Sequence, residues 1–226
     1  VYFDGDVENS SSEDGTNTVR ISNGRVVTAK TLLTLEASTG KIEPAGKLTL
    51  NAGTGVVFLD DLLGAATGKP LVINADYEIH GDGTLTVWTG KTIRSNDSVI
   101  TVTAWDMDMD GSLTSGIAAT NLHGAKSDQT IGIGGTSKDM HIEDSEVQRL
   151  SMSGGLRFGS NTGGSITVDG ITQAGSDYIS PVVTMVANGD EHQVSFLMTA
   201  SSFYAIAAQA DNGVVHVIDA VLVQSP

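Results

Sequence analysis

Three aspartates alternate with methionines in the segment DMDMDG at residues 106–111. Alternate carboxylates followed by glycine open the calcium loop of helix–loop–helix proteins, but that loop needs a glutamate at its twelfth position, where this chain has Ile117. On a strand, the alternation puts Asp106, Asp108 and Asp110 on one side, where a cation would relieve their mutual repulsion. The triad is therefore a candidate metal site, with calcium as the one candidate cofactor, and a plain solvated face is the favoured interpretation.

The other polar residues do not form a recognisable catalytic set. Asp60 and Asp61 are adjacent, but neighbouring residues of a strand point to opposite faces, whereas glycosidases need two carboxylates flanking one bond. The five histidines lie in separate segments, and the chain has no nucleophile elbow, no phosphate-binding glycine loop and no cysteine. We expect no catalytic residues and no enzymatic activity, and polysaccharide cleavage is the least favoured function.

The charge balance excludes two classes of partner. The 226 residues include 12 Lys and Arg against 27 Asp and Glu, which gives a formal net charge of −15 at pH 7. A chain this acidic has no general electrostatic attraction for nucleic acid or anionic lipid. No apolar run approaches the roughly 18 residues that span a bilayer. We expect neither nucleic-acid binding nor membrane insertion.

Short runs of Val, Ile, Leu and Thr separated by Gly, Asn or Asp are typical of an all-β protein. The chain has 27 Gly and 4 Pro, aromatic residues make up only 5%, and no sustained helical stripe is present. Residues 46–53 and 83–90 echo each other, as in stacked repeats. We predict a right-handed parallel β-helix, with a β-sandwich or jelly roll as the alternative. The glycines of 130–136 suggest a tight corner, and 59–64 and 143–150 suggest single helical turns.

Residues 1–18 differ in composition from the rest. They are acidic and Ser-rich, which predicts an N-terminal arm before a single β-helical domain over 19–226. The apolar start of the arm, Val1, Tyr2 and Phe3, suggests docking on a neighbouring subunit. The chain does not begin with Met, which is typical of a processed product or a piece of a longer protein.

Residues 130–172 carry a likeness to a known repeat. They run from TIGIGG through MHI and SEVQRL to GLRFG and GSITVDGIT. This order resembles the filamentous-haemagglutinin-like repeat of very large extracellular surface and adhesin proteins of bacteria and algae, over roughly residues 83–215. The resemblance implies a right-handed parallel β-helix that serves as an extracellular or cell-surface stalk, fibre or adhesin, without catalysis. This chain departs from the family in its short length, its acidic start and its lack of a recognisable secretion domain.

The C-terminal segment 214–223 is strongly β-forming and nearly uncharged. A strand without Lys or Pro to block its edge is a template for another chain. We therefore predict assembly contacts at Val215, Val217, Val221 and Val223, which would meet Val1–Phe3 of the next copy in a homo-oligomer or filament. The competing hypothesis is a monomeric module that binds surface carbohydrate, with or without calcium.

Two tripeptides match the acceptor pattern for N-glycosylation. Asn9 and Asn96 each stand two residues before a serine, and either would carry sugar if the protein is secreted through an endoplasmic reticulum. Both are expected at the surface. Such short patterns also arise by chance.

Overall fold

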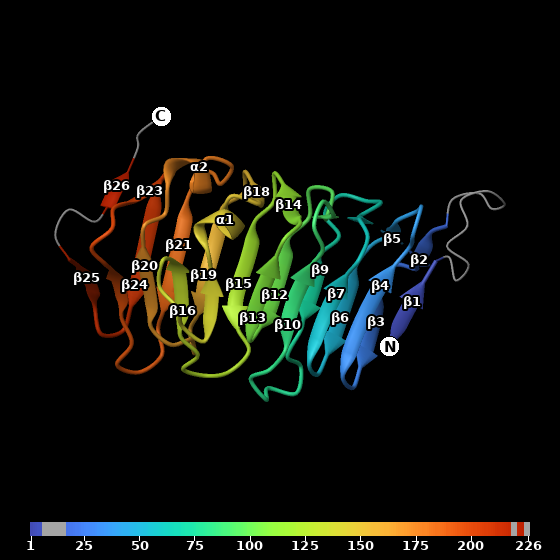
Figure 1. Ribbon diagram of the computed structural model, residues 1–226, viewed down its shortest axis with the longest axis horizontal. Helices are drawn as coiled ribbons and strands as arrows, with labels where there is room; N and C mark the ends of the chain where they lie inside the picture. Colours follow the sequence, from blue (N-terminus) through green and yellow to red (C-terminus); the bar gives the residue numbers. More distant parts are fainter. Residues whose placement is uncertain (6–16, 218–220, 224–226) are drawn as a thin grey trace.

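The chain folds into one parallel β-helix whose coils stack along the long axis of the molecule (Figure 1). This computed structural model describes residues 1–5, 17–217 and 221–223. Every pairing between the described strands is parallel. The predicted parallel β-helix is confirmed, and a sandwich or jelly roll is excluded because these are built from antiparallel strands.

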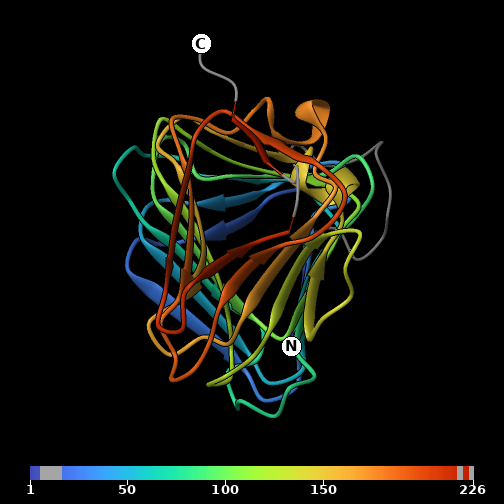
Figure 2. The ribbon, with the colours of Figure 1, turned by 90° about the vertical axis from the view of Figure 1, so that its left-hand side faces the viewer.

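The strands lie on three faces, seen along the axis in Figure 2. Face 1 contains, in spatial order, β1 (Tyr2–Asp4), β4 (Leu32–Glu36), β7 (Gly55–Phe58), β10 (Thr84–Val87), β13 (Asp106–Met109), β17 (Met140–Ile142), β16 (Ile131–Gly134), β20 (Ile166–Asp169), β22 (Val194–Phe196) and β25 (Val214–His216). Face 2 contains β2 (Val19–Ile21), β5 (Ile42–Pro44), β8 (Leu62–Leu63), β11 (Thr92–Arg94), β14 (Ser112–Gly116), β18 (Leu150–Met152), β23 (Ser201–Phe203) and β26 (Val221–Val223). Face 3 contains β3 (Arg25–Ala29), β6 (Leu48–Ala52), β9 (Leu71–Asn74), β12 (Ile100–Ala104), β15 (Thr120–Gly124), β19 (Leu156–Ser160), β21 (Val183–Ala187) and β24 (Ile206–Ala210). On face 2, β18 and β23 belong to separate sheets, because the chain between β20 and β21 forms a helical turn instead of a strand.

The core is a set of aliphatic rows that run from coil to coil. On face 1, Leu35, Phe58, Val87 and Met109 stand in register on successive strands and are all buried. Side chains alternate between inside and outside along each strand, so each strand gives two or three residues to such rows. Burying one aliphatic side chain stabilises the fold by about 1.5–3 kcal/mol. A narrow core therefore forms with few aromatic residues.

Face 1 is interrupted by a strand that is out of sequence order. After β15 the chain forms β16, turns back through residues 135–139, and forms β17 between β13 and β16. The short return passes close to β16: a Cβ at Gly132 would lie 1.9 Å from the carbonyl oxygen of Thr136. Gly134 has φ +86°, and a Cβ there would lie 2.1 Å from the carbonyl oxygen of Asp169. Only glycine fits both positions.

Three expectations from the sequence need correction. The alternating glycines Gly132 and Gly134 lie in strand β16 rather than at a corner, because Gly132 makes room for the returning chain and Gly134 for the Asp169 carbonyl of β20. Residues 59–64 contain no helix; one helical turn, α1 (Asp144–Val147), falls in 143–150, and another, α2 (Gln173–Ser176), was not expected. The arm does not include the first residues, because β1 pairs with β4 as part of the first coil. The rest of the expected arm, residues 6–16, lies outside the described residues.

We predict that Gly132→Ala lowers the free energy of unfolding by about 1–3 kcal/mol, as overpacking typically does. The added methyl group must displace the backbone of the 135–139 return. Gly135→Ala is the matched control, because its Cβ would meet no atom nearer than 3.6 Å. Urea unfolding of the three proteins measures the effect, and equal midpoints for the two variants would contradict this account of the return.

Candidate functional site

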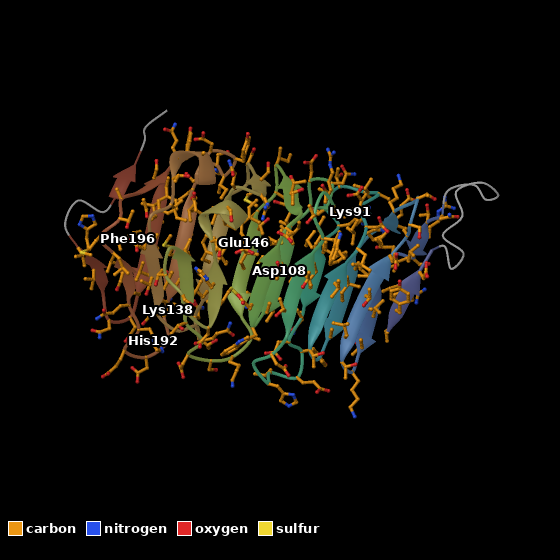
Figure 3. All side chains as sticks on the ribbon, in the orientation of Figure 1. Lys91, Asp108, Lys138, Glu146, His192 and Phe196 are labelled. Carbon is orange, nitrogen blue, oxygen red and sulfur yellow. The ribbon has the colours of Figure 1, made fainter. Side chains whose placement is uncertain are left out.

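The predicted aspartate triad lies beside the interruption of face 1. Met107 and Met109 of β13 point into the core and are buried, as the alternation predicts. Asp106 is half-buried, whereas Asp108 and Asp110 are exposed on the outer side of the strand. Figure 3 shows Asp108 and Glu146 close to the middle of the long axis, far from both ends.

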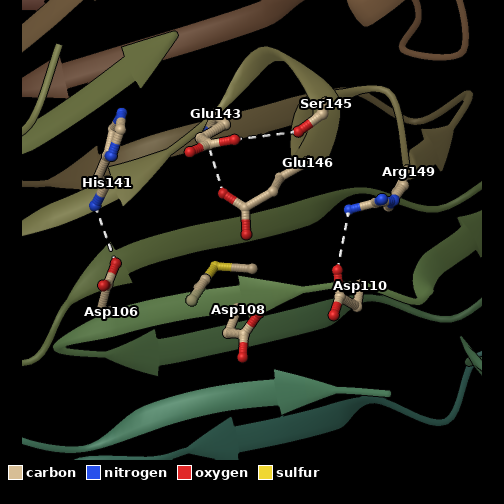
Figure 4. A pocket seen from close by; sticks show the side chains of 9 residues that line it. Asp106, Asp108, Asp110, His141, Glu143, Ser145, Glu146 and Arg149 are labelled. Atoms are coloured by element: carbon tan, nitrogen blue, oxygen red, sulfur yellow. Dashed lines mark hydrogen bonds and ion pairs between the residues drawn. The ribbon is translucent and has the colours of Figure 1, made fainter. Parts of the chain in front are cut away.

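Side chains, rather than a neighbouring strand, satisfy the free edge of β13. The backbone N–H of Met109 donates to Oε1 of Glu146 at 2.8 Å, and Nη1 of Arg149 donates to the Met109 carbonyl at 2.5 Å. Oδ1 of Asp106 accepts from the backbone N–H of His141 at 2.9 Å (Figure 4). β13 and β17 share no ladder among the described strands, so these bonds replace one.

Glu146 holds this junction together from helix α1. Its Oε2 accepts from the backbone N–H of Glu143 at 2.8 Å, which completes a capping box at the start of the helix. Burial raises the pKa of the Glu146 carboxyl above its ordinary value, and the charges of Glu143 and Asp106 act in the same direction. The N–H donors of Met109 and Glu143 oppose the rise.

A pocket of about 340 Å³ lies over the junction (Figure 4). Its lining consists of Asp106, Met107, Asp108, Asp110, His141, Glu143, Ser145, Glu146 and Arg149. Arg149 Nη1 lies 3.8 Å from Oδ1 of Asp110, a partly exposed ion pair of small energetic value. Within the described part of the chain, no three His, Asp or Glu side chains come together in a way that could hold a metal ion. Calcium binding by the triad stays a prediction.

Sequence reasoning did not connect the triad with its partners. His141, Glu146 and Arg149 follow the contacted residues of β13 by 35 to 40 positions, and no spacing rule joins them. One local signal was available, the pair Glu143 and Glu146 three residues apart, which matches the second half of a capping box. That signal locates the helical turn but not the strand that it covers.

The predicted assembly residues lie at the two opposite ends of the β-helix (Figure 1). Tyr2 and Phe3 belong to β1, and the N-terminal amine of Val1 donates to the Leu32 carbonyl at 2.7 Å. These residues therefore pair with their own chain on one side. Val215 lies in β25, and the N–H of Val217 donates to the Phe196 carbonyl at 3.0 Å.

The remaining assembly residues and the glycosylation candidates have different settings. Val221 and Val223 belong to β26, which pairs with β23.

Of the two glycosylation candidates, Asn9 lies outside the described residues. Asn96 is half-buried at φ +58° in the turn between β11 and β12, and Ser98 of its tripeptide is buried. Glycosylation of either asparagine stays a prediction.

The comparisons with known proteins leave family membership open. A scan against protein-family models, a search of curated proteins and a search of solved structures each found no match. No helix in the described ranges has the length and apolar character needed to cross a membrane. The likeness to filamentous-haemagglutinin repeats accordingly stays an expectation from the residues.

We predict a pH-dependent effect of Glu146→Gln. A raised pKa means that the folded state binds this proton more tightly than the unfolded state, so the contribution of Glu146 to stability falls as pH rises from about 4.5. The free energy of unfolding of the wild type, minus that of the variant, should decrease over this window. Urea unfolding at a series of pH values measures it. Ser145→Ala, which keeps the carboxylate, should give a flat difference; a rising difference for Glu146→Gln would refute the assignment.

Proposed function

We propose that this protein is a structural, extracellular β-helical subunit that stacks end to end with copies of itself into a filament or surface layer. The observation that carries the proposal is the state of the two ends. At each end, three strands pair on one side only within the described ranges: β1, β2 and β3 at one end, and β25, β26 and β24 at the other. Unpaired edges of this kind are templates for further strands.

The two ends match face by face. On faces 1, 2 and 3 the edge strands have 3, 3 and 5 residues at the N-terminal end, and 3, 3 and 5 residues at the C-terminal end. A second copy placed on the axis would therefore continue each ladder with a strand of equal length. Such a head-to-tail contact does not close on itself, so it propagates.

Apolar rows also continue to both ends on face 3. Val27 stands in the row of Leu50 at one end, and Ala208 stands in the row of Met185 at the other. Val27 and Ala208 are each only partly buried, because no further coil covers them. Stacking would complete these rows with the same kind of residue that fills the core. The hydrophobic gain comes with continued backbone pairing.

Charged residues at the ends bear on the register of this contact. If β24 of one copy continues into β3 of the next with Ala210 opposite Ala29, Asp211 comes next to Lys30. Arg25 is the one charged residue in an inward row of β1–β3, where it aligns with Leu48. An inward-pointing charge discourages edge pairing, so stacking requires the long Arg25 side chain to turn its guanidinium group to solvent at the junction.

The alignment of β25 with β22 changes which of its residues are most useful for blocking assembly. Val215 aligns with Ser195, whereas Val214 and His216 align with the buried Val194 and Phe196. The inward row of β25 is therefore formed by Val214 and His216. Val215, which the sequence suggested, lies on the outward side of this strand.

We predict that Val27→Lys and Ala208→Lys each stop filament growth, because each places a charge in an end row that the next copy must cover. The neighbouring changes Val26→Lys and Ala207→Lys are matched controls, since both residues are exposed and align with the outward-facing Thr49 and Thr184. Light scattering and electron microscopy measure particle size. The controls should still form filaments.

Mixing the two blocked variants gives a second test of polarity. Each retains one intact end, so Val27→Lys and Ala208→Lys together should form a one-to-one dimer that neither forms alone. Sedimentation velocity resolves the dimer from the monomer. A wild type that stays monomeric at every concentration, or a mixture that stays monomeric while the wild type assembles, would overturn the stacking model.

A further inference from the structure

The corner between faces 1 and 2 changes length from coil to coil. Residues 37–41 connect β4 to β5 and residues 88–91 connect β10 to β11, but only residues 59–61 connect the intervening β7 to β8. A short corner between two longer ones leaves a hollow, here with a volume of about 610 Å³. We call it the corner notch. Leu59 and Asp60 of the short corner form its floor. The turn at 37–41 is its first wall, together with the end of β4, and the turn at 88–91 is its second wall.

The carboxylate of Asp60 accepts hydrogen bonds from both walls of the corner notch. The residue is 3% exposed, and its Oδ2 accepts from the backbone N–H of Ala37 at 2.8 Å, in the first wall. Its Oδ1 accepts from the ammonium group of Lys91, in the second wall. A buried carboxylate with both oxygens engaged by opposite walls holds the notch in one shape. Preorganisation of this kind lowers the entropic cost of binding a ligand.

Trp88 stands in the second wall with its side chain largely in solvent. The residue is 57% exposed, although its backbone is fixed by hydrogen bonds to Phe58 and from Lys91, each of 3.0 Å. The cation–π contact found among the described side chains belongs to Lys126 and Trp105 instead. An indole held by its backbone and left open to water beside a hollow is suited to a ligand with an apolar surface.

The opposite wall supplies polar groups. Ser38 and Thr39 line it with hydroxyl groups, and Glu36 adds a carboxylate. Oγ1 of Thr39 accepts from Nδ2 of Asn17 at 3.0 Å, which leaves its own proton to donate. Glu36 is positioned by a hydrogen bond from the hydroxyl of Tyr2. A ligand in the corner notch therefore meets one aromatic face and several hydrogen-bonding groups.

We propose that the corner notch binds a neutral sugar ring of a polysaccharide or glycan. A pyranose has an apolar C–H face, which stacks on indole, and a rim of hydroxyl groups, which need donors and acceptors. An anionic ligand is disfavoured, because Lys91 is already paired with Asp60, Glu36 is negative and the whole chain carries −15. An apolar ligand would make no use of the hydroxyl and carboxylate groups in the opposite wall. The volume is within the usual range for small-molecule sites.

We expect sugar binding at this position not to depend on stacking. The corner notch lies on the side of the β-helix, between coils that both have neighbours, and Figure 3 shows Lys91 away from both ends. The stacking variants Val27→Lys and Ala208→Lys should therefore bind sugar like the wild type. Failure of one proposal leaves the other intact.

The test uses the two tryptophans as reporter and control. Trp105→Phe leaves Trp88 as the sole tryptophan, and its fluorescence is titrated with cellohexaose, maltohexaose and mannohexaose. We expect a saturable change with at least one of these neutral sugars. By calorimetry, Trp88→Ala should weaken that binding by about tenfold or more, since this is the effect of losing about 1.4 kcal/mol of contact energy. Trp105→Ala should bind within about twofold of the wild type.

Three results would overturn the assignment. The first is the absence of saturable binding for all three sugars up to about 10 mM, well above the concentration expected for weak sites. The second is an equal loss of affinity in Trp88→Ala and Trp105→Ala, which would remove binding from the corner notch. The third is tighter binding of the anionic trigalacturonate than of any neutral sugar.

Discussion

Each coil of this protein must place its backbone N–H and C=O groups opposite those of the next coil, at the spacing of about 4.8 Å that parallel strands require. The rest of the structure depends on that constraint. It keeps the rows of aliphatic residues in register, because a shift of one residue would move the buried side chains of a whole strand to the solvent face. It leaves the corners free to vary, since they carry no ladder. The corner notch and the acidic pocket both arise where coils differ in the way they turn.

The interruption of face 1 shows what happens when the ladder cannot continue. β13 ends its sheet in the middle of the molecule, beside a strand that comes from later in the sequence. Its exposed backbone groups are satisfied by Glu146 and Arg149 instead. The carboxylate is held in a partly dry position as a result, and this burial explains its raised pKa. One carboxylate of the pocket, that of Glu146, is therefore there because it replaces the missing strand pairing of β13.

The sequence was sufficient for the fold but not for the order of its strands. Alternating aliphatic residues and scattered glycines predicted a parallel β-helix, and the alternation put Met107 and Met109 inside correctly. The position of β17 could not be predicted, because it depends on which strand a five-residue return can reach in space. The glycines at 132 and 134 suggested a corner, whereas they make room for the Thr136 carbonyl of the return and for the Asp169 carbonyl of β20. In the sequence Asp60 stood out only as the neighbour of Asp61, whereas its hydrogen-bond partners Ala37 and Lys91 lie 23 and 31 residues away.

The late arrival of Glu146 and Arg149 has a consequence for the way this chain folds. A β-helix can form coil by coil from its amino terminus as the chain is made, each coil templating the next. Here β14 and β15 can pair with β11 and β12 at once, whereas the edge of β13 on face 1 stays open, because the groups that close it come 37 and 40 residues after Met109. Until they are synthesised, the first coils present an open rim at that point. With coil-by-coil folding, face 1 would therefore be closed at β13 only after helix α1 has formed.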